Sequence, residues 1–160
     1  DHRLDEFARL VELVDAGDVR NVGVSNFTPD LLDEAQSHLD APVFANQVEC
    51  HPLFQQDELL EHCRDHDALL VAYSPLAKAQ VFDVPELVDI AEKHDATAAQ
   101  VSLAWLVQRD GVCAIPKARG DHVEENYAAL DVDLDEEDVA RIDGLDVEER
   151  LVRPDTGPWA

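Results

Sequence analysis

Four short apolar runs, separated by segments of helical character, are the feature that most constrains the fold of this chain. The runs cover residues 19–25, 43–48, 68–73 and 111–116. Strands that are apolar on both faces are typical of a parallel sheet covered by helices. The pattern therefore predicts an α/β fold of four consecutive β/α units.

The segments between the runs carry helix signals. Apolar residues recur at helical spacing from Leu4 to Val14, and Gly17 follows them as a stop signal. Thr28 is placed as an N-cap with Pro29 at the first helical position, and Asp135 as a second N-cap. Further helices are predicted over 29–38, 56–66, 85–94, 97–109, 121–130 and 135–144, and residues 150–160 as a loop.

Two architectures have this order of elements. A doubly wound sheet usually carries a glycine-rich phosphate loop after its first strand, and Gly23-Val24-Ser25-Asn26 is not such a loop. A (β/α)8 TIM barrel instead collects its functional groups at the carboxyl ends of its strands. The sequence favours the barrel, and its 160 residues, against about 250 for a typical barrel, provide only four of the eight units.

Polar side chains stand where each apolar run stops. They are Ser25 and Asn26, Gln47 with Glu49, Tyr73 and Ser74, and Lys117. One polar residue at such a point is usually a turn former or a cap, but four occurrences at the same end predict a shared site. Amide and hydroxyl groups can hydrogen-bond a carboxamide, tyrosine can stack on a flat ring, and Ser74 with Lys117 can meet phosphate oxygens. The set indicates a nicotinamide dinucleotide.

The charge balance excludes several partners. The chain has 36 acidic and 12 basic residues, a formal charge of −24, and no apolar run long enough to span a membrane. Nucleic acid and anionic membranes require clustered Lys and Arg, so neither is an expected partner. Such an acidic chain is expected in a cytoplasm of very high ionic strength, as in a halophile.

Cysteine usage and the first residues bear on compartment and completeness. Cys50, Cys63 and Cys113 are an odd number and widely spaced, which indicates free thiols in a reducing cytosol. The chain starts at Asp1 without an initiator Met or an export leader. We therefore expect a cytoplasmic protein and a sequence cut from a longer one.

At its polar strand ends the chain resembles the aldo-keto reductase family. The matching stretches occur in family order and are residues 23–27 (GVSNF), 46–52 (NQVECHP), 72–76 (AYSPL), 100–105 (QVSLAW), 115–117 (IPK) and 125–126 (EN). The resemblance implies that residues 1–160 are the carboxyl-terminal half of a TIM barrel, strands five to eight, with 150–160 as the C-terminal loop. The missing amino-terminal half-barrel is then the expected partner.

The resemblance also implies a function, the reduction of an aldehyde or ketone to an alcohol by NADP(H), or by NAD(H). Ser25, Asn26 and Gln47 would hold the nicotinamide carboxamide, and Tyr73 would pack on the ring. The remaining implied contacts are Ser74 and Leu76 with the pyrophosphate, Lys117 with phosphate, Glu125 and Asn126 with adenine, and Trp159 with a small carbonyl substrate. The family's catalytic tyrosine and its supporting residues would lie on the first four strands, so no catalytic residue is expected in this chain.

One departure from the family pattern leaves the choice between NADPH and NADH open. The segment from Lys117 to Asn126 is one residue shorter than usual, and His122 stands where an arginine usually grips the 2′-phosphate. A neutral imidazole attracts a phosphate dianion less than a guanidinium does. Arg119 is a candidate replacement.

Other functions remain open from the residues themselves. The half-barrel could stand alone, pair through its sheet edges with a second copy and bind a dinucleotide without turnover. An unrelated barrel enzyme, such as an aldolase, would use Lys117 for Schiff-base chemistry.

Several residues invite a functional reading but are assigned structural roles. His62 and His66 lie at i, i+4 on one helix, but no paired Cys-x-x-Cys accompanies them, so no metal site is predicted. Trp105 and Cys63 are assigned to the core, and Glu49 to a structural salt bridge or backbone hydrogen bond.

Overall fold

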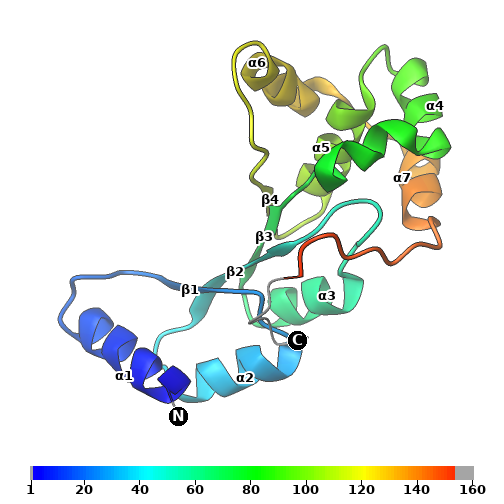
Figure 1. Cartoon of the computed structure of the whole chain (residues 1–160). Coiled ribbons are helices and arrows are strands. Elements are labelled where there is room, and N and C mark those ends of the chain that lie inside the picture. Colours follow the sequence, from blue (N-terminus) through cyan, green and yellow to red (C-terminus); the bar gives the residue numbers. More distant parts are fainter. Residues whose placement is uncertain (1, 154–160) are drawn as a thin grey trace.

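Four parallel strands form one sheet in the order β1-β2-β3-β4 (Figure 1). The computed structural model describes residues 2–153, with side chains from residue 9 onward. The strands are β1 (Val22–Ser25), β2 (Val43–Glu49), β3 (Leu69–Tyr73) and β4 (Val112–Ala114). Each coincides with one of the four predicted apolar runs, although β2 extends one residue beyond its run, to Glu49. The prediction of an α/β fold with four parallel strands is confirmed.

Helices connect the strands. They are α1 (His2–Asp15), α2 (Pro29–Ser37), α3 (Asp57–Asp65), α4 (Pro85–Lys93), α5 (Ala98–Gln108), α6 (His122–Tyr127) and α7 (Glu136–Asp143), with 3-10 helices η1 (Ala77–Asp83) and η2 (Ala128–Asp131). The helix predicted over 121–130 is thus divided into α6 and η2. The segment η1 was not predicted, and it is broken internally because Lys78 and Ala79 have positive φ angles of 50° and 75°.

The predicted helix starts are confirmed by their caps. The Thr28 side chain accepts a hydrogen bond from the Leu31 N–H at the start of α2, directly before Pro29. The Asp135 side chain accepts from the Glu137 and Asp138 N–H groups at the start of α7. These bonds satisfy backbone donors that have no partner within the helix, so they define where each helix begins.

The two faces of the sheet differ in burial. Asn46, Val48, Leu70 and Ala72 are buried on the face that packs against the helices, where Trp105 of α5 and Cys63 of α3 also lie in the core as predicted. Residues that share the opposite face are paired in register as Ser25 with Gln47, Gln47 with Val71 and Val71 with Cys113. These four residues are exposed or half-buried.

No helix in residues 2–153 combines the length and the apolar character needed to cross a membrane. The three cysteines form no disulfide, and Cys113 is the exposed one. Free thiols were predicted from the odd number and wide spacing of the cysteines.

Candidate functional site

Four of the predicted site residues are joined by hydrogen bonds at the carboxyl ends of β1, β2 and β3. The Tyr73 hydroxyl donates to Asn26 Oδ1 at 2.9 Å. The backbone carbonyl of Gln47 accepts from Ser25 Oγ at 2.9 Å and from the Asn26 N–H at 2.9 Å. We call Ser25, Asn26, Gln47 and Tyr73 the amide cluster. The Ser25 and Gln47 residues are exposed, so the cluster offers hydroxyl and amide groups to a ligand.

A fully buried neighbour, Asn46, positions the loop that carries Asn26. The Asn46 side chain donates to the Phe27 carbonyl at 2.9 Å and accepts from the Phe27 N–H at 3.3 Å. Asn26 itself has a positive φ of 60°, a conformation that asparagine adopts more readily than most residues. Asn46 was not assigned a role from the sequence, although a polar residue inside an apolar run was a signal that could have indicated one.

The environment of Tyr73 keeps its hydroxyl protonated. Burial raises the pKa of Tyr73 above its ordinary value, and the negative charge of Glu49 raises it further, against smaller opposing contributions from Arg150 and hydrogen bonds. A protonated hydroxyl is required for the donated bond to Asn26. Tyr73 therefore fixes the Asn26 amide and leaves its Nδ2 donors available.

Glu49 is fully buried and holds the segment 150–152, which we call the strap. Its carboxylate accepts from His51 Nε2 at 3.0 Å, from the Leu151 N–H at 2.7 Å and from the Val152 N–H at 2.9 Å. Burial lowers the pKa of His51, more than the Glu49 carboxylate raises it, so the ring is neutral with its proton on Nε2. The structural role predicted for Glu49 is confirmed. Trp159 lies beyond the strap, outside the described residues.

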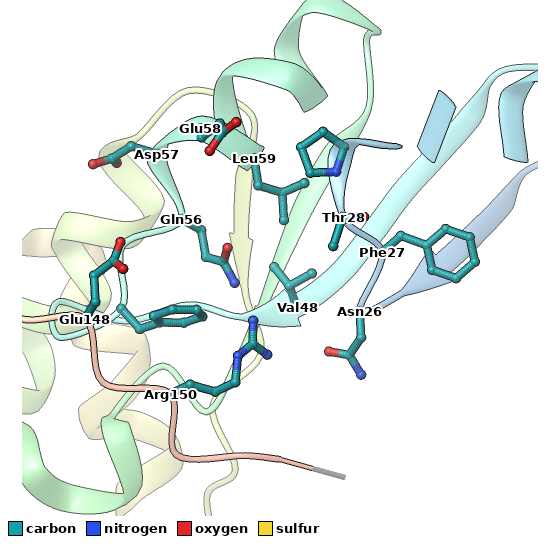
Figure 2. Close-up of a pocket in the computed structure, with 12 residues that line it drawn as sticks. Asn26, Phe27, Thr28, Val48, Gln56, Asp57, Glu58, Leu59, Glu148 and Arg150 are labelled. Atoms are coloured by element: carbon teal, nitrogen blue, oxygen red, sulfur yellow. The ribbon is translucent and has the colours of Figure 1, made fainter. Parts of the chain in front are cut away.

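A cavity of about 260 Å³ adjoins the amide cluster. Asn26 and Val48 line it together with Gln56 at the start of α3 and Arg150 of the strap. Figure 2 shows Arg150 and Asn26 on either side of Val48. The Arg150 guanidinium lies 4.6 Å from the centre of the Phe54 ring, so a cation–π contact positions it at the cavity wall.

Four other predicted residues line a second, larger cleft of about 640 Å³. They are Leu76, Lys117, Glu125 and Asn126, which come from the loop between β3 and η1, the segment after β4, and α6. Arg119 and His122 line the same cleft, and His122 Nδ1 lies 2.7 Å from Glu125 Oε2. The cleft therefore carries a lysine, an arginine and a histidine in a chain whose overall charge is strongly negative.

The predicted residues thus form two groups rather than one cradle. Ser25 ends β1 and Lys117 follows β4, and these strands are the two edges of the sheet. Ser74 lies between the groups in sequence, has a positive φ of 50°, and accepts the Ala77 N–H through its carbonyl at 2.9 Å. The arrangement can hold an extended ligand with an amide at one end and an anionic group at the other.

The chain resembles known proteins along nearly its whole length. The family model described as "Aldo/keto reductase family" matches residues 2–147. A glyoxal reductase from Bacillus subtilis is 39% identical over 92% of this chain and 53% of its own length. The zebrafish (Danio rerio) aldo-keto reductase family 1 member A1-A is 33% identical over 96% of this chain and 50% of its own length.

Solved structures agree with the sequence relatives. A putative 2,5-diketo-D-gluconic acid reductase B matches with a TM-score of 0.90 and 36% identity, over 95% of this chain and 55% of that protein. An aldo-keto reductase of the silkworm Bombyx mori complexed with NADPH matches with a TM-score of 0.80 and 32% identity, over 89% of this chain and 47% of that protein. The chain spans about half the length of the relatives it matches.

One part of the prediction from the sequence is not supported. The resemblance assigned the chain to the carboxyl-terminal half of the barrel, strands five to eight. The comparisons establish the family over residues 2–147 and a span of about half of each relative, and they do not support that assignment, which is withdrawn. Chain length determines how many β/α units are present, but not which ones, because every unit repeats the same strand–helix pattern. What stands is that the chain belongs to the aldo/keto reductase family.

Proposed function

We propose that this chain supplies the dinucleotide site of an oxidoreductase that reduces an aldehyde or ketone to an alcohol with NADP(H) or NAD(H). The observation that carries the proposal is that the amide cluster and the second cleft, which carries Lys117, Arg119 and His122, both lie at the carboxyl ends of the strands. Family membership supports the same reaction class, since relatives are reductases by name and one was solved with NADPH.

The amide cluster suits the nicotinamide end. A carboxamide donates through its N–H groups and accepts through its carbonyl oxygen, so its site needs both acceptors and donors. The hydroxyl of Ser25 and the amides of Asn26 and Gln47 provide both. The Tyr73 ring is half-buried beside them and can pack on a planar heterocycle. Its hydroxyl bond to Asn26 orders the amide before a ligand arrives, which reduces the entropy cost of binding.

The second cleft suits the phosphates and adenosine. We assign Ser74 and Leu76 to the pyrophosphate, Lys117 to phosphate oxygens, and Glu125 with Asn126 to the adenine. Arg119 and His122 are the groups that can distinguish a 2′-phosphate from a 2′-hydroxyl. Because Glu125 lies within 2.7 Å of the His122 ring, its charge offsets part of any attraction that a protonated His122 exerts on a phosphate.

The general acid of the reaction is assigned to the rest of the protein. Bound nicotinamide supplies the hydride, and an acid must protonate the carbonyl oxygen that receives it. The chain has two tyrosines: Tyr73 is committed to Asn26, and Tyr127 lies exposed on α6. Without a positioned acid, turnover falls by about 10²–10⁴-fold, so these 160 residues alone are expected to be inactive.

The remaining half of the barrel is the proposed partner for the uncovered face of the sheet. Among the described residues, Val71 and Cys113 lie on that face without a covering layer, and the outer edges of β1 and β4 pair with no further strand. A second copy of this half-barrel could cover the same face, giving a dinucleotide-binding module without activity. The small carbonyl substrate would approach beside the strap, and Trp159 is proposed to contact it.

Cofactor titration tests the proposal. The intact protein in molar KCl is titrated with NADPH and with NADH, following fluorescence. Replacing Gln47 or Lys117 by Ala should weaken both cofactors by about 10–100-fold, the range for losing a hydrogen bond that involves a charged or buried group. Glu61→Gln, an exposed change on α3, is the matched control. Unchanged dissociation constants in both variants would overturn the assignment, and binding without carbonyl reduction would favour the inactive module.

A further inference from the structure

A histidine of α3, the histidine that caps the C-terminus of α3 and an aspartate of α2 meet on the helix side of the molecule. Asp33 Oδ1 lies 3.0 Å from His62 Nε2 and 3.8 Å from His66 Nε2. One ligand atom from each residue lies within 4.8 Å of the others. The two imidazole rings are stacked with centroids 4.4 Å apart. We call these three residues the α2–α3 cluster.

The tautomer of His66 leaves a bare nitrogen facing the carboxylate. His66 Nδ1 lies 2.8 Å from the His62 carbonyl oxygen, which can only accept, so Nδ1 carries the proton. Nε2 of the neutral ring then presents a lone pair toward Asp33 Oδ1. Two acceptors that face each other repel unless something bridges them: a proton on Nε2, a water molecule that donates to both, or a metal ion. A ring nitrogen fixed by a bond from its other N–H to a carbonyl is a usual feature of metal-bound histidine.

His62 contributes a second ring nitrogen to the cluster. Its Nε2 is buried and has no hydrogen-bond partner among the described residues, although Asp33 Oδ1 is close. Buried polar atoms are rarely left without a partner, so an unpaired one calls for an explanation such as an ion. The three residues line a small cavity of about 10 Å³, which is about the space that one water-sized particle occupies.

The spacing matches the ligand shell of a tetrahedral metal ion. Zinc bonds of about 2.0–2.2 Å to nitrogen and oxygen place ligand atoms about 3.3–3.6 Å apart. The two separations from Asp33 Oδ1, 3.0 and 3.8 Å, bracket that range. Two imidazoles with one carboxylate favour Zn²⁺ and similar transition-metal ions over Mg²⁺ or Ca²⁺, which prefer oxygen ligands.

We infer that Asp33, His62 and His66 form a binding site for a divalent transition-metal ion, with Zn²⁺ as the representative, that clamps α2 to α3. The exposure of Asp33 and His66 leaves a fourth position open to water. Cys63, one residue from His62, does not belong to the group of residues whose ligand atoms lie within 4.8 Å of one another.

The site is separate from the proposed cofactor site. In a β/α unit the helix runs antiparallel to the strand, so the carboxyl end of β2 lies beside the start of α3. His62 and His66 stand at the other end of α3, where His66 is its C-cap. Failure of metal binding would therefore leave the dinucleotide proposal untouched.

Zinc titration of the intact protein tests the inference. All variants are made in a Cys113→Ser background, because Cys113 is an exposed thiol that could bind zinc on its own. Calorimetry should give one Zn²⁺ per chain, with Co²⁺ in its place showing the visible absorption of a tetrahedral site. Asp33→Asn and His66→Gln should each weaken Zn²⁺ by more than tenfold, since losing only an outer partner of a ligand costs about 10–100-fold.

The control is His38→Gln, which alters an exposed histidine at the C-terminal cap of α2. It should bind zinc as the background protein does, and thermal unfolding without metal should show that all variants remain folded. Zinc should raise the unfolding temperature of the background and of His38→Gln, but not of His62→Gln. Absence of zinc binding, unchanged affinity in Asp33→Asn and His66→Gln, or equal displacement by Mg²⁺ would each overturn the inference.

Discussion

The Tyr73 hydroxyl donates a 2.9 Å hydrogen bond to Asn26 Oδ1 across the carboxyl end of β2, linking two strands that are not neighbours in the sheet. Asn26 follows β1, Tyr73 ends β3, and the Gln47 carbonyl between them accepts from Ser25 and Asn26. Three strand ends are thereby joined into one surface. The same bond determines which atoms of the Asn26 amide remain available to a ligand.

Removing the Tyr73 hydroxyl should weaken cofactor binding modestly. Tyr73→Phe keeps the ring and loses one neutral hydrogen bond, so we expect a dissociation constant for NADPH about 3–10-fold higher. Tyr73→Ala also loses the ring and should bind more weakly still. Fluorescence titration of the intact protein measures both, and a Phe variant as impaired as the Ala variant would mean that the ring makes no stacking contribution.

Neutralising Glu49 should release the strap. Glu49→Gln loses the charge that three donors share and introduces an amide donor beside the Leu151 and Val152 N–H groups. We expect a loss of about 1–3 kcal/mol in the free energy of unfolding, the cost of leaving buried polar groups unpaired. Urea unfolding measures it, and proteolysis within residues 150–153 should become faster. The control is Glu148→Gln, an exposed change nearby that should alter neither property.

Protonation of Asp138 should lower the free energy of unfolding in acid. Burial raises the pKa of this carboxyl, but hydrogen bonds from Lys93, His94 and the Asp135 N–H outweigh that effect, so its pKa lies below the ordinary 3.8. Because the folded pKa is depressed, its contribution is complete above pH 3.8 and is lost as the pH falls through the folded value.

Urea unfolding at pH 7 and at pH 3 checks this expectation. Asp138→Asn should cost about 1–3 kcal/mol at pH 7 and less at pH 3, because the link from α7 to Lys93 and His94 of α4 is then weakened in both proteins. An equal cost at the two pH values would show that the charge of Asp138 does not contribute.

Salt should stabilise the protein. A formal charge of −24 repels itself over a Debye length of about 10 Å at 0.1 M salt and about 3 Å at 1 M. We therefore expect the unfolding temperature to rise steadily with KCl, as measured by circular dichroism. Sucrose at matched osmolality is the control for an uncharged solute. An unfolding temperature that does not change with KCl concentration would contradict the predicted high-salt habitat.

The elements that the sequence predicted well are those whose signals are local. The apolar runs gave four strands, and the caps at Thr28 and Asp135 gave helix starts, because a side chain and the N–H it binds are two or three residues apart. Two elements were mispredicted. The 3-10 helix η1 depends on positive φ values at Lys78 and Ala79, which their residue types do not favour, and the helix predicted over 121–130 changes to 3-10 geometry at Ala128.

The sequence predicted which residues belong to the candidate site, and the tertiary structure showed that they divide between two cavities. The polar residues at the strand ends predicted the members of the amide cluster. Lys117 lies in a second cleft because β4 is at the far edge of the sheet, and the order of strands in a sheet cannot be read from a list of apolar runs. Asn46 and Glu49 act through the Phe27 backbone and the strap, and such bonds leave no spacing pattern in the sequence.

Sequence by itself determined the strands, the helices, the charge and the chemical groups at the strand ends, since periodicity and capping act within a few residues of the chain. Tertiary packing alone decided that Asp33 meets His62 and His66, and that Glu49 binds an N–H more than a hundred residues away. These contacts depend on how α2 packs beside α3 and on where the strap lies relative to β2. Such distances are set by the packed core as a whole, and no local pattern encodes them.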